Sequence, residues 1–209
     1  MGEIIRMKKN GIMLASICTA LLWIIVIQLT DMKNLNTVFP LMIYIDATMM
    51  SFLLIGVAMM FEKQENSIKS LLVTPVSKQQ YLVSKTLAVM TSSVFTLAIL
   101  LVYGILVKGL DINLPGIFGT VLLVGFVFSQ AGILLTYFSR DFTDLLMGVF
   151  KIAIVLAVPT VLEALKILNA GWIKTVQYFN PTKSAMNLLM ATVVDIETKD
   201  LLISVGYLV

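Results

Sequence analysis

The chain has 209 residues, of which 59% are hydrophobic and 13% are charged, and its mean hydropathy is +0.98. Soluble domains have about 25% charged residues, so this composition excludes a soluble domain and predicts an all-α integral membrane protein. The net charge of +3 comes from basic residues spread along the predicted membrane loops, a distribution that does not indicate a nucleic acid partner.

The residue types also restrict the chemistry. The sequence has no histidine, and its single cysteine, Cys18, lies inside an apolar run, so we expect no disulfide framework and no metal site. It contains no G-x-x-x-x-G-K-[ST] motif, and the chain is therefore not expected to bind ATP through a P-loop. We expect no catalytic residues and no cofactor on this chain.

Apolar runs divide the chain into helices that can cross a membrane, each of which needs about 20 residues for roughly 30 Å of hydrocarbon. We expect a single transmembrane domain over residues 1–209 with six spans. Their predicted bounds are 11–30, 40–61, 84–107, 115–138, 145–167 and 200–209. The last run reaches only about 14 Å at 1.5 Å per residue. Either the sequence is cut within the sixth span or the chain ends in a half-inserted tail, and we favour the cut.

The first span follows a basic flank. Arg6, Lys8 and Lys9 precede it, and basic residues concentrate on the cytoplasmic side of membrane proteins, so the N-terminus is predicted to be cytoplasmic. A secretory signal peptide is the competing interpretation, but the run is long for one and lacks a small-residue cleavage site.

The second span is predicted to begin at Pro40, because proline is favoured at the first position of a helix. Asp46 would then lie about 9 Å below the outer end at 1.5 Å per residue. An ionisable residue within a span is a functional candidate, here for a substrate path. Alternatively, Asp46 is hydrated near the interface or pairs with an outer lysine such as Lys166.

A polar segment, residues 62–85, separates the second and third spans. Ile68, Leu71 and Leu72 have the i, i+3, i+4 spacing of one helical face, which predicts a short amphipathic helix. We expect this helix to end near Thr74, because the residue before a proline is disfavoured in the α conformation.

A further helix is predicted to begin at Lys78 and to continue as the third span. Ser77 is placed as its N-cap, and Gln80 three residues later completes a capping box. Inside the span, Ser92 and Thr96 are four residues apart and share one helical face. Small hydroxyl residues commonly allow membrane helices to pack closely, and lining a substrate path is the second interpretation.

The fifth span contains Lys151, which can extend to the headgroups, and Pro159, which is expected to kink the helix. Further along, Asn180 followed by Pro181 reads as an N-cap and a first helical residue. We therefore expect a short outer helix before the last span.

The 62–85 segment carries a family resemblance. It contains Glu62, Glu65, the Leu71-Leu72 pair, Thr74-Pro75-Val76-Ser77, Tyr81 and Ser84-Lys85. These residues resemble the first cytoplasmic loop of ABC-2 type transporter permeases, and within that family the drug-export type, including permeases for fluoroquinolones. The resemblance implies the six-span ABC-2 (type V exporter) fold, with a cytoplasmic coupling helix at about 64–73.

The resemblance also implies partners. A separate ABC ATP-binding subunit would hold ATP and Mg²⁺, a second permease copy would complete a homo- or heterodimer, and lipid would surround both in the plasma membrane of a bacterium. This chain would be a transport subunit and not an enzyme. The residues implied to dock the ATPase are Glu62, Glu65, Ile68, Lys69, Leu71, Leu72 and Pro75.

We therefore expect the membrane subunit of an ATP-driven exporter that moves a hydrophobic or amphipathic drug, peptide or lipid by alternating access. Asp46, Ser92 and Thr96 are the candidate residues of its substrate path. The alternative function is an ion- or proton-coupled carrier or channel subunit that uses Asp46, Lys151 and Glu163 as a relay within the membrane. A third possibility is an anchor for a cytoplasmic enzyme.

Overall fold

The structure is a computed structural model that describes residues 12–30, 35–65, 77–110, 112–165, 180–193, 204–206 and 208. Within these residues the regular structure is helical. Four helices in this part of the chain are long and apolar enough to cross a membrane: Thr37–Gln64, Lys78–Lys108, Leu114–Phe138 and Phe142–Ala164. The shortest has 23 residues and a length of about 34 Å at 1.5 Å per residue, which exceeds the hydrocarbon thickness. The prediction of an all-α membrane protein is confirmed.

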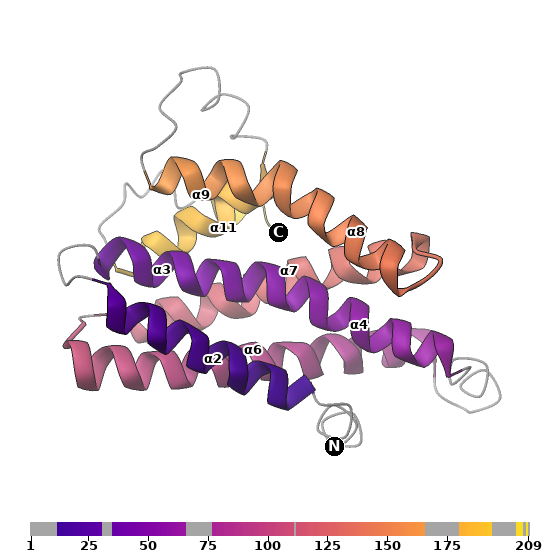
Figure 1. Ribbon diagram of the computed structural model, residues 1–209, viewed down its shortest axis with the longest axis horizontal. Helices are drawn as coiled ribbons and strands as arrows, with labels where there is room; N and C mark the ends of the chain where they lie inside the picture. Colours follow the sequence, from indigo (N-terminus) through magenta and orange to yellow (C-terminus); the bar gives the residue numbers. More distant parts are fainter. Residues whose placement is uncertain are drawn as a thin grey trace.

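The helices run side by side along the longest axis of the molecule (Figure 1). α2 (Ile12–Leu29) packs on α6 (Lys78–Lys108), and α4 (Ser51–Gln64) packs on α7 (Leu114–Phe138). We call the end of the bundle where α4 ends and α6 begins the 65–77 end, which lies on the right in Figure 1. The other end is called the opposite end.

The second span is a long helix that contains a π-helical turn. α3 (Leu35–Ile45), the turn η2 (Asp46–Met50) and α4 follow one another directly. The prediction that this span begins at Pro40 is wrong, because Pro40 lies inside α3. An internal proline removes one helical hydrogen bond, and membrane helices tolerate this where neighbouring groups satisfy the freed carbonyl. Asp46 is consequently about 16 Å from the start of α3 at 1.5 Å per residue, deeper than expected.

The start of α6 agrees with the sequence. The Ser77 hydroxyl accepts a hydrogen bond from the Gln80 N–H at 3.2 Å, and the Gln80 side-chain oxygen accepts one from the Ser77 N–H at 3.1 Å. The predicted capping box is confirmed. At its other end α6 stops at Gly109, whose φ of 64° is a left-handed conformation that glycine adopts without a steric penalty.

α4 and α7 approach each other closely at a glycine. A Cβ atom added at Gly132 would lie 2.5 Å from Ile55 Cγ2 and 2.6 Å from the carbonyl oxygen of Phe52. At Gly119, also in α7, an added Cβ would meet nothing within 4 Å. Small residues let the backbones of membrane helices come together, so Gly132 is where the fourth span fits against the second.

The fifth span also contains a π-helical turn. It consists of α8 (Phe142–Ile152), the turn η3 (Ala153–Ala157) and α9 (Val158–Ala164). The turn ends at Ala157, and Pro159 follows two residues later in α9. Both π-helical turns and prolines are established causes of helix bending, so the irregularity expected here from the sequence is present. The span begins at Phe142, three residues before the predicted start, because Asp141 N-caps it.

α11 (Pro181–Met190) begins as predicted, with Asn180 as its N-cap and proline in the first turn. The Thr182 hydroxyl and the Asn180 amide donate hydrogen bonds of 2.7 and 2.9 Å to the carbonyl oxygen of Leu156 in η3. The Thr160 hydroxyl donates a third, at 3.1 Å. These bonds fasten the start of α11 to the irregular part of the fifth span.

The second span is the centre of the bundle and the fifth lies at its edge. In the most apolar stretch of each, 72% of the second-span residues are buried inside the chain, against 22% for the fifth. Phe150, Ile154 and Val155 are among the exposed apolar side chains of the fifth span. In a membrane, such a face meets lipid tails or another membrane helix.

Two predicted elements lie largely outside the described residues. Of the coupling helix expected at about 64–73, the structure describes only Gln64 and Glu65, where α4 ends. Of the last apolar run, 200–209, it describes 204–206 and 208. The prediction of a sixth span is therefore left as a prediction.

Candidate functional site

A buried ion pair joins α4 to α6 at the 65–77 end. Lys85 Nζ donates a hydrogen bond to one carboxylate oxygen of Glu62, and the Tyr81 hydroxyl donates to the other. Glu62 is 1% exposed and Lys85 is 5% exposed. Lys85 Nζ also lies 5.7 Å from the centre of the Tyr81 ring, within the range of a cation–π contact. Both charges are desolvated, and each compensates the other. We call Glu62, Tyr81 and Lys85 the stem cluster.

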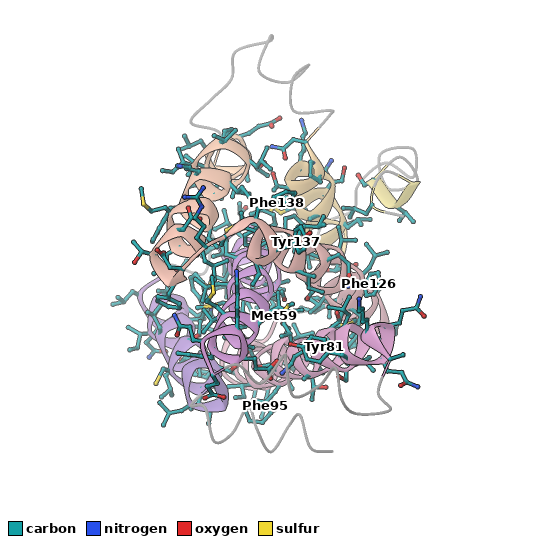
Figure 2. The ribbon with its side chains drawn as sticks, turned by 90° about the vertical axis from the view of Figure 1, so that its right-hand side faces the viewer. Met59, Tyr81, Phe95, Phe126, Tyr137 and Phe138 are labelled. Atoms are coloured by element: carbon teal, nitrogen blue, oxygen red, sulfur yellow. The ribbon has the colours of Figure 1, made fainter. Side chains whose placement is uncertain are left out.

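Local structure places the three side chains of the stem cluster. Tyr81 and Lys85 are four residues apart, so they lie on one face of the first turns of α6. The capping box at Ser77 determines where those turns begin. Glu62 belongs to the last turn of α4. Figure 2 views the bundle from this end, with Tyr81 labelled in the lower half of the molecule.

A second contact holds the same end of α4 to the turn between α7 and α8. Lys63 Nζ donates a hydrogen bond of 2.7 Å to the carbonyl oxygen of Ser139. The rings of Phe61 and Phe142 stack with their centroids 6.2 Å apart. The last turn of α4 is therefore attached on two sides, immediately before the segment in which the coupling helix was predicted.

The seven residues predicted to dock an ATPase are described only in part. Glu62 lies in the buried stem cluster and not on an exposed rim, so in this structure it holds α4 against α6. Glu65 is exposed at the end of α4. The other five lie outside the described residues: Ile68, Lys69, Leu71, Leu72 and Pro75.

The sequence identified Tyr81 and Lys85 as part of the family motif, but their contacts with Glu62 were not predicted. A signal was available, because Glu62 ends one long apolar run and Lys85 begins the next. Two spans joined by a short loop bring such positions to the same depth, where opposite charges are expected to pair.

The three residues predicted to line a substrate path do come together. Asp46 of η2 lines a small cavity with Ser92 and Thr96 of α6. Five further side chains complete its lining: Ser16, Thr19, Met50, Leu54 and Ser93. The free volume of about 10 Å³ is close to the least that holds one water molecule. Drug-sized ligands occupy pockets of about 300–1,000 Å³, so this cavity does not fit such a cargo in this conformation.

Hydroxyl groups connect the helices around this cavity. The hydroxyls of Ser16 in α2 and Ser92 in α6 share a hydrogen bond. Those of Ser51 in α4 and Ser93 in α6 share another, at 3.0 Å. The first and second spans are thereby both hydrogen-bonded to the third at the level of the cavity.

The other charged residues proposed for an intramembrane relay lie elsewhere. Lys151 is an exposed residue of α8 and does not line the cavity at Asp46. Glu163 forms an ion pair of 2.9 Å with Lys183 of α11, at the opposite end. This pair borders a separate cavity of about 190 Å³, which Met186 and Met190 also line. The structure does not assemble Asp46 and Lys151 into one site.

Three comparisons place the chain among known proteins. A family model described as "ABC-2 family transporter protein" matches residues 25–209. The chain is also similar to the fluoroquinolones export permease protein of Mycobacterium tuberculosis, in strains CDC 1551 and H37Rv. The identity to each is 27% over 195 residues, which cover 90% of this chain and 77% of the relative. No solved structure matches.

Proposed function

The chain belongs to the ABC-2 family of transporter membrane proteins, and from this premise we propose that it is the permease of an ATP-driven exporter of hydrophobic or amphipathic compounds. An ABC-2 permease is the non-catalytic membrane subunit of its transporter. We propose that ATP and Mg²⁺ are bound by a separate ATP-binding subunit, and that two permease copies form the transport unit.

The observation that carries this proposal is the attachment of α4 on both sides of its last turn. The segment 66–76 connects α4 to α6. The stem cluster links the two helices on either side of this segment, with Glu62 before it and Tyr81 and Lys85 after it. Force applied to the segment by a bound ATPase therefore reaches the second and third spans together. We place this end of the bundle in the cytoplasm, where the ATPase is.

The class of cargo is argued from the membrane-spanning surfaces. The exposed side chains of the fifth span include the large apolar residues Phe150, Ile154 and Val155. Two relatives are named as exporters of fluoroquinolones, which supports a drug-like compound. We propose that the cargo moves along apolar surfaces between two permease copies as these open on alternate sides. A route through Asp46, Ser92 and Thr96 would require the hydrogen bond between Ser16 and Ser92 to break.

The test of this proposal is co-purification of the chain with a candidate ABC ATP-binding subunit, followed by measurement of ATP turnover in nanodiscs. The double variant Leu71→Glu/Leu72→Glu places two charges on the face predicted to dock. We expect it to lose the partner or to lose most of the stimulated ATP turnover, since charges are depleted at interface cores.

The matched control is Lys108→Glu, which changes the net charge by the same two units at the opposite end of α6. It is expected to keep both the partner and the turnover. If the Leu71→Glu/Leu72→Glu variant binds the ATPase and stimulates turnover as well as the unmodified chain, the proposed docking face is wrong.

A further inference from the structure

Asp46 is an isolated acidic group deep in the bundle. It lies about 16 Å along the helix from Leu35 and about 27 Å from Gln64, at 1.5 Å per residue. Its side chain is 6% exposed within the chain itself. Since the helix that carries it spans the membrane, neither water nor headgroups solvate it freely. An ionised carboxylate in such a place requires a compensating positive charge.

The protein does not supply that charge from the residues that the structure describes. The buried and half-buried ion pairs found there are Glu62 with Lys85 and Glu163 with Lys183, and neither includes Asp46. α2 and α6 contribute hydroxyl side chains to the cavity, and α4 contributes Leu54. Titratable groups of α3, α6 and α7 do not line it.

Trp23 of α2 also faces the Asp46 carboxyl group. Its indole nitrogen is buried. An indole N–H is a neutral donor, so it does not balance a full negative charge. Among the described residues no charge balances an ionised Asp46, and a proton or a bound cation is the neutralising species that the cavity itself can hold.

We propose that the cavity at Asp46 binds one small monovalent cation, either a sodium ion coordinated by the carboxylate or a proton that binds to a carboxylate oxygen. The free volume of about 10 Å³ matches a single water-sized occupant. One carboxylate balances one positive charge. Small hard cations prefer oxygen ligands, and the cavity offers the hydroxyls of Ser16, Thr19, Ser92 and Thr96.

The hydroxyl ligands suit either form of this cation. A hydroxyl group is both a donor and an acceptor, so it can turn its lone pairs toward a sodium ion or accept the O–H of a protonated carboxyl group. The π-helical turn at Asp46–Met50 places the carboxylate where the helix departs from regular geometry, as is frequent at functional sites. The occupied cavity would hold α2, η2 and α6 together.

Trp23 provides an optical probe for the test. The chain has two tryptophans, Trp23 and Trp172, so the variant Trp172→Phe leaves Trp23 as the only one. The full chain, purified in nanodiscs, is titrated with sodium chloride against choline chloride at constant ionic strength and pH. A second titration varies pH in sodium-free buffer. Trp23 fluorescence and the midpoint of thermal unfolding are recorded in both.

We expect a saturable response in at least one arm. A response to sodium chloride but not to choline chloride identifies sodium, and a response to pH alone identifies a proton. Asp46→Asn should abolish the response while Glu163→Gln, an acid-to-amide change at the opposite end, should keep it. Thr96→Val removes one oxygen ligand and should weaken apparent binding about tenfold. This second variant serves if Asp46→Asn does not fold.

Two results would overturn the proposal. One is an unchanged signal across both titrations in a folded sample of the Trp172→Phe chain. The other is a response that persists at full size in Asp46→Asn or, should that variant not fold, is unaltered in Thr96→Val. The measurement involves no ATPase and no cargo, so its outcome is independent of the proposed transport function.

Discussion

At the scale of single residues, Glu62 has surroundings that the family resemblance did not imply. The resemblance placed it among the polar docking residues, whereas the structure buries it against Tyr81 and Lys85. Sequence patterns locate a charge along a helix, but whether it points outward depends on which neighbouring helix faces it. Asp46, Ser92 and Thr96 were grouped from the sequence as candidates for a substrate path, and the structure places all three around one cavity.

The stem cluster leads to a prediction about stability. Glu62→Met removes the carboxylate that pairs with the buried Lys85 ammonium, and Lys85→Met removes the ammonium that pairs with the buried Glu62 carboxylate. Breaking a buried ion pair in this way typically costs about 3–5 kcal/mol. The double variant removes both charges and should lose much less stability than the two single losses added together. Thermal unfolding in detergent, analysed as a double-mutant cycle, measures this coupling. Lys78→Met, an exposed change one helical turn before Tyr81, is the control. Additive losses would show that the two charges act independently.

At the scale of elements, the sequence predicted helix starts correctly where a side chain caps the helix. The capping box at Ser77 and the N-cap at Asn180 were both recognised from two or three side chains, and both are present. The predicted start of the second span was wrong. Proline is favoured in the first turn of a helix, but this preference does not exclude that the helix begins several residues before it. The π-helical turn at Asp46–Met50 left no signal that the sequence analysis used, since it depends on packing against neighbouring helices.

The contact between α4 and α7 leads to a second prediction. Gly132→Ala adds a methyl group where Ile55 and the backbone of Phe52 leave no room. Overpacking of this kind typically costs about 1–3 kcal/mol. Gly119→Ala lies in the same helix with open space around it, so it should be neutral or should stabilise by up to about 1 kcal/mol through helix propensity. Thermal unfolding of the two variants compares them directly. Equal midpoints would mean that the helices separate easily at Gly132.

At the scale of the whole molecule, composition and apolar run lengths were sufficient to predict a multi-pass helical membrane protein. The order of helices along the chain also followed from those runs. How they pack did not follow. The runs do not distinguish the second span, which is mostly buried, from the fifth, of which a much smaller share is buried, because both are predominantly apolar and only their neighbours differ.

The orientation of the bundle is open to a direct measurement. In a Cys18→Ser background, Glu65→Cys marks the 65–77 end and Lys108→Cys marks the opposite end. Since basic residues flank the first span on its N-terminal side, we expect the 65–77 end to be cytoplasmic. A membrane-impermeant maleimide added to intact cells should then label Lys108→Cys and reach Glu65→Cys only after lysis. The reverse labelling pattern would contradict both this orientation and the proposed site of ATPase docking.

The anchor of α11 has a consequence for how variants of this protein should be interpreted. Three side-chain donors meet at Leu156, but the atom that receives them is a main-chain oxygen, which every amino acid possesses. The side chain at position 156 can therefore change without loss of these hydrogen bonds, whereas they require the side chains of Asn180 and Thr182. Natural sequence variation would therefore show a constraint at Asn180 and Thr182. It would show none at position 156, whose side chain takes no part in these hydrogen bonds.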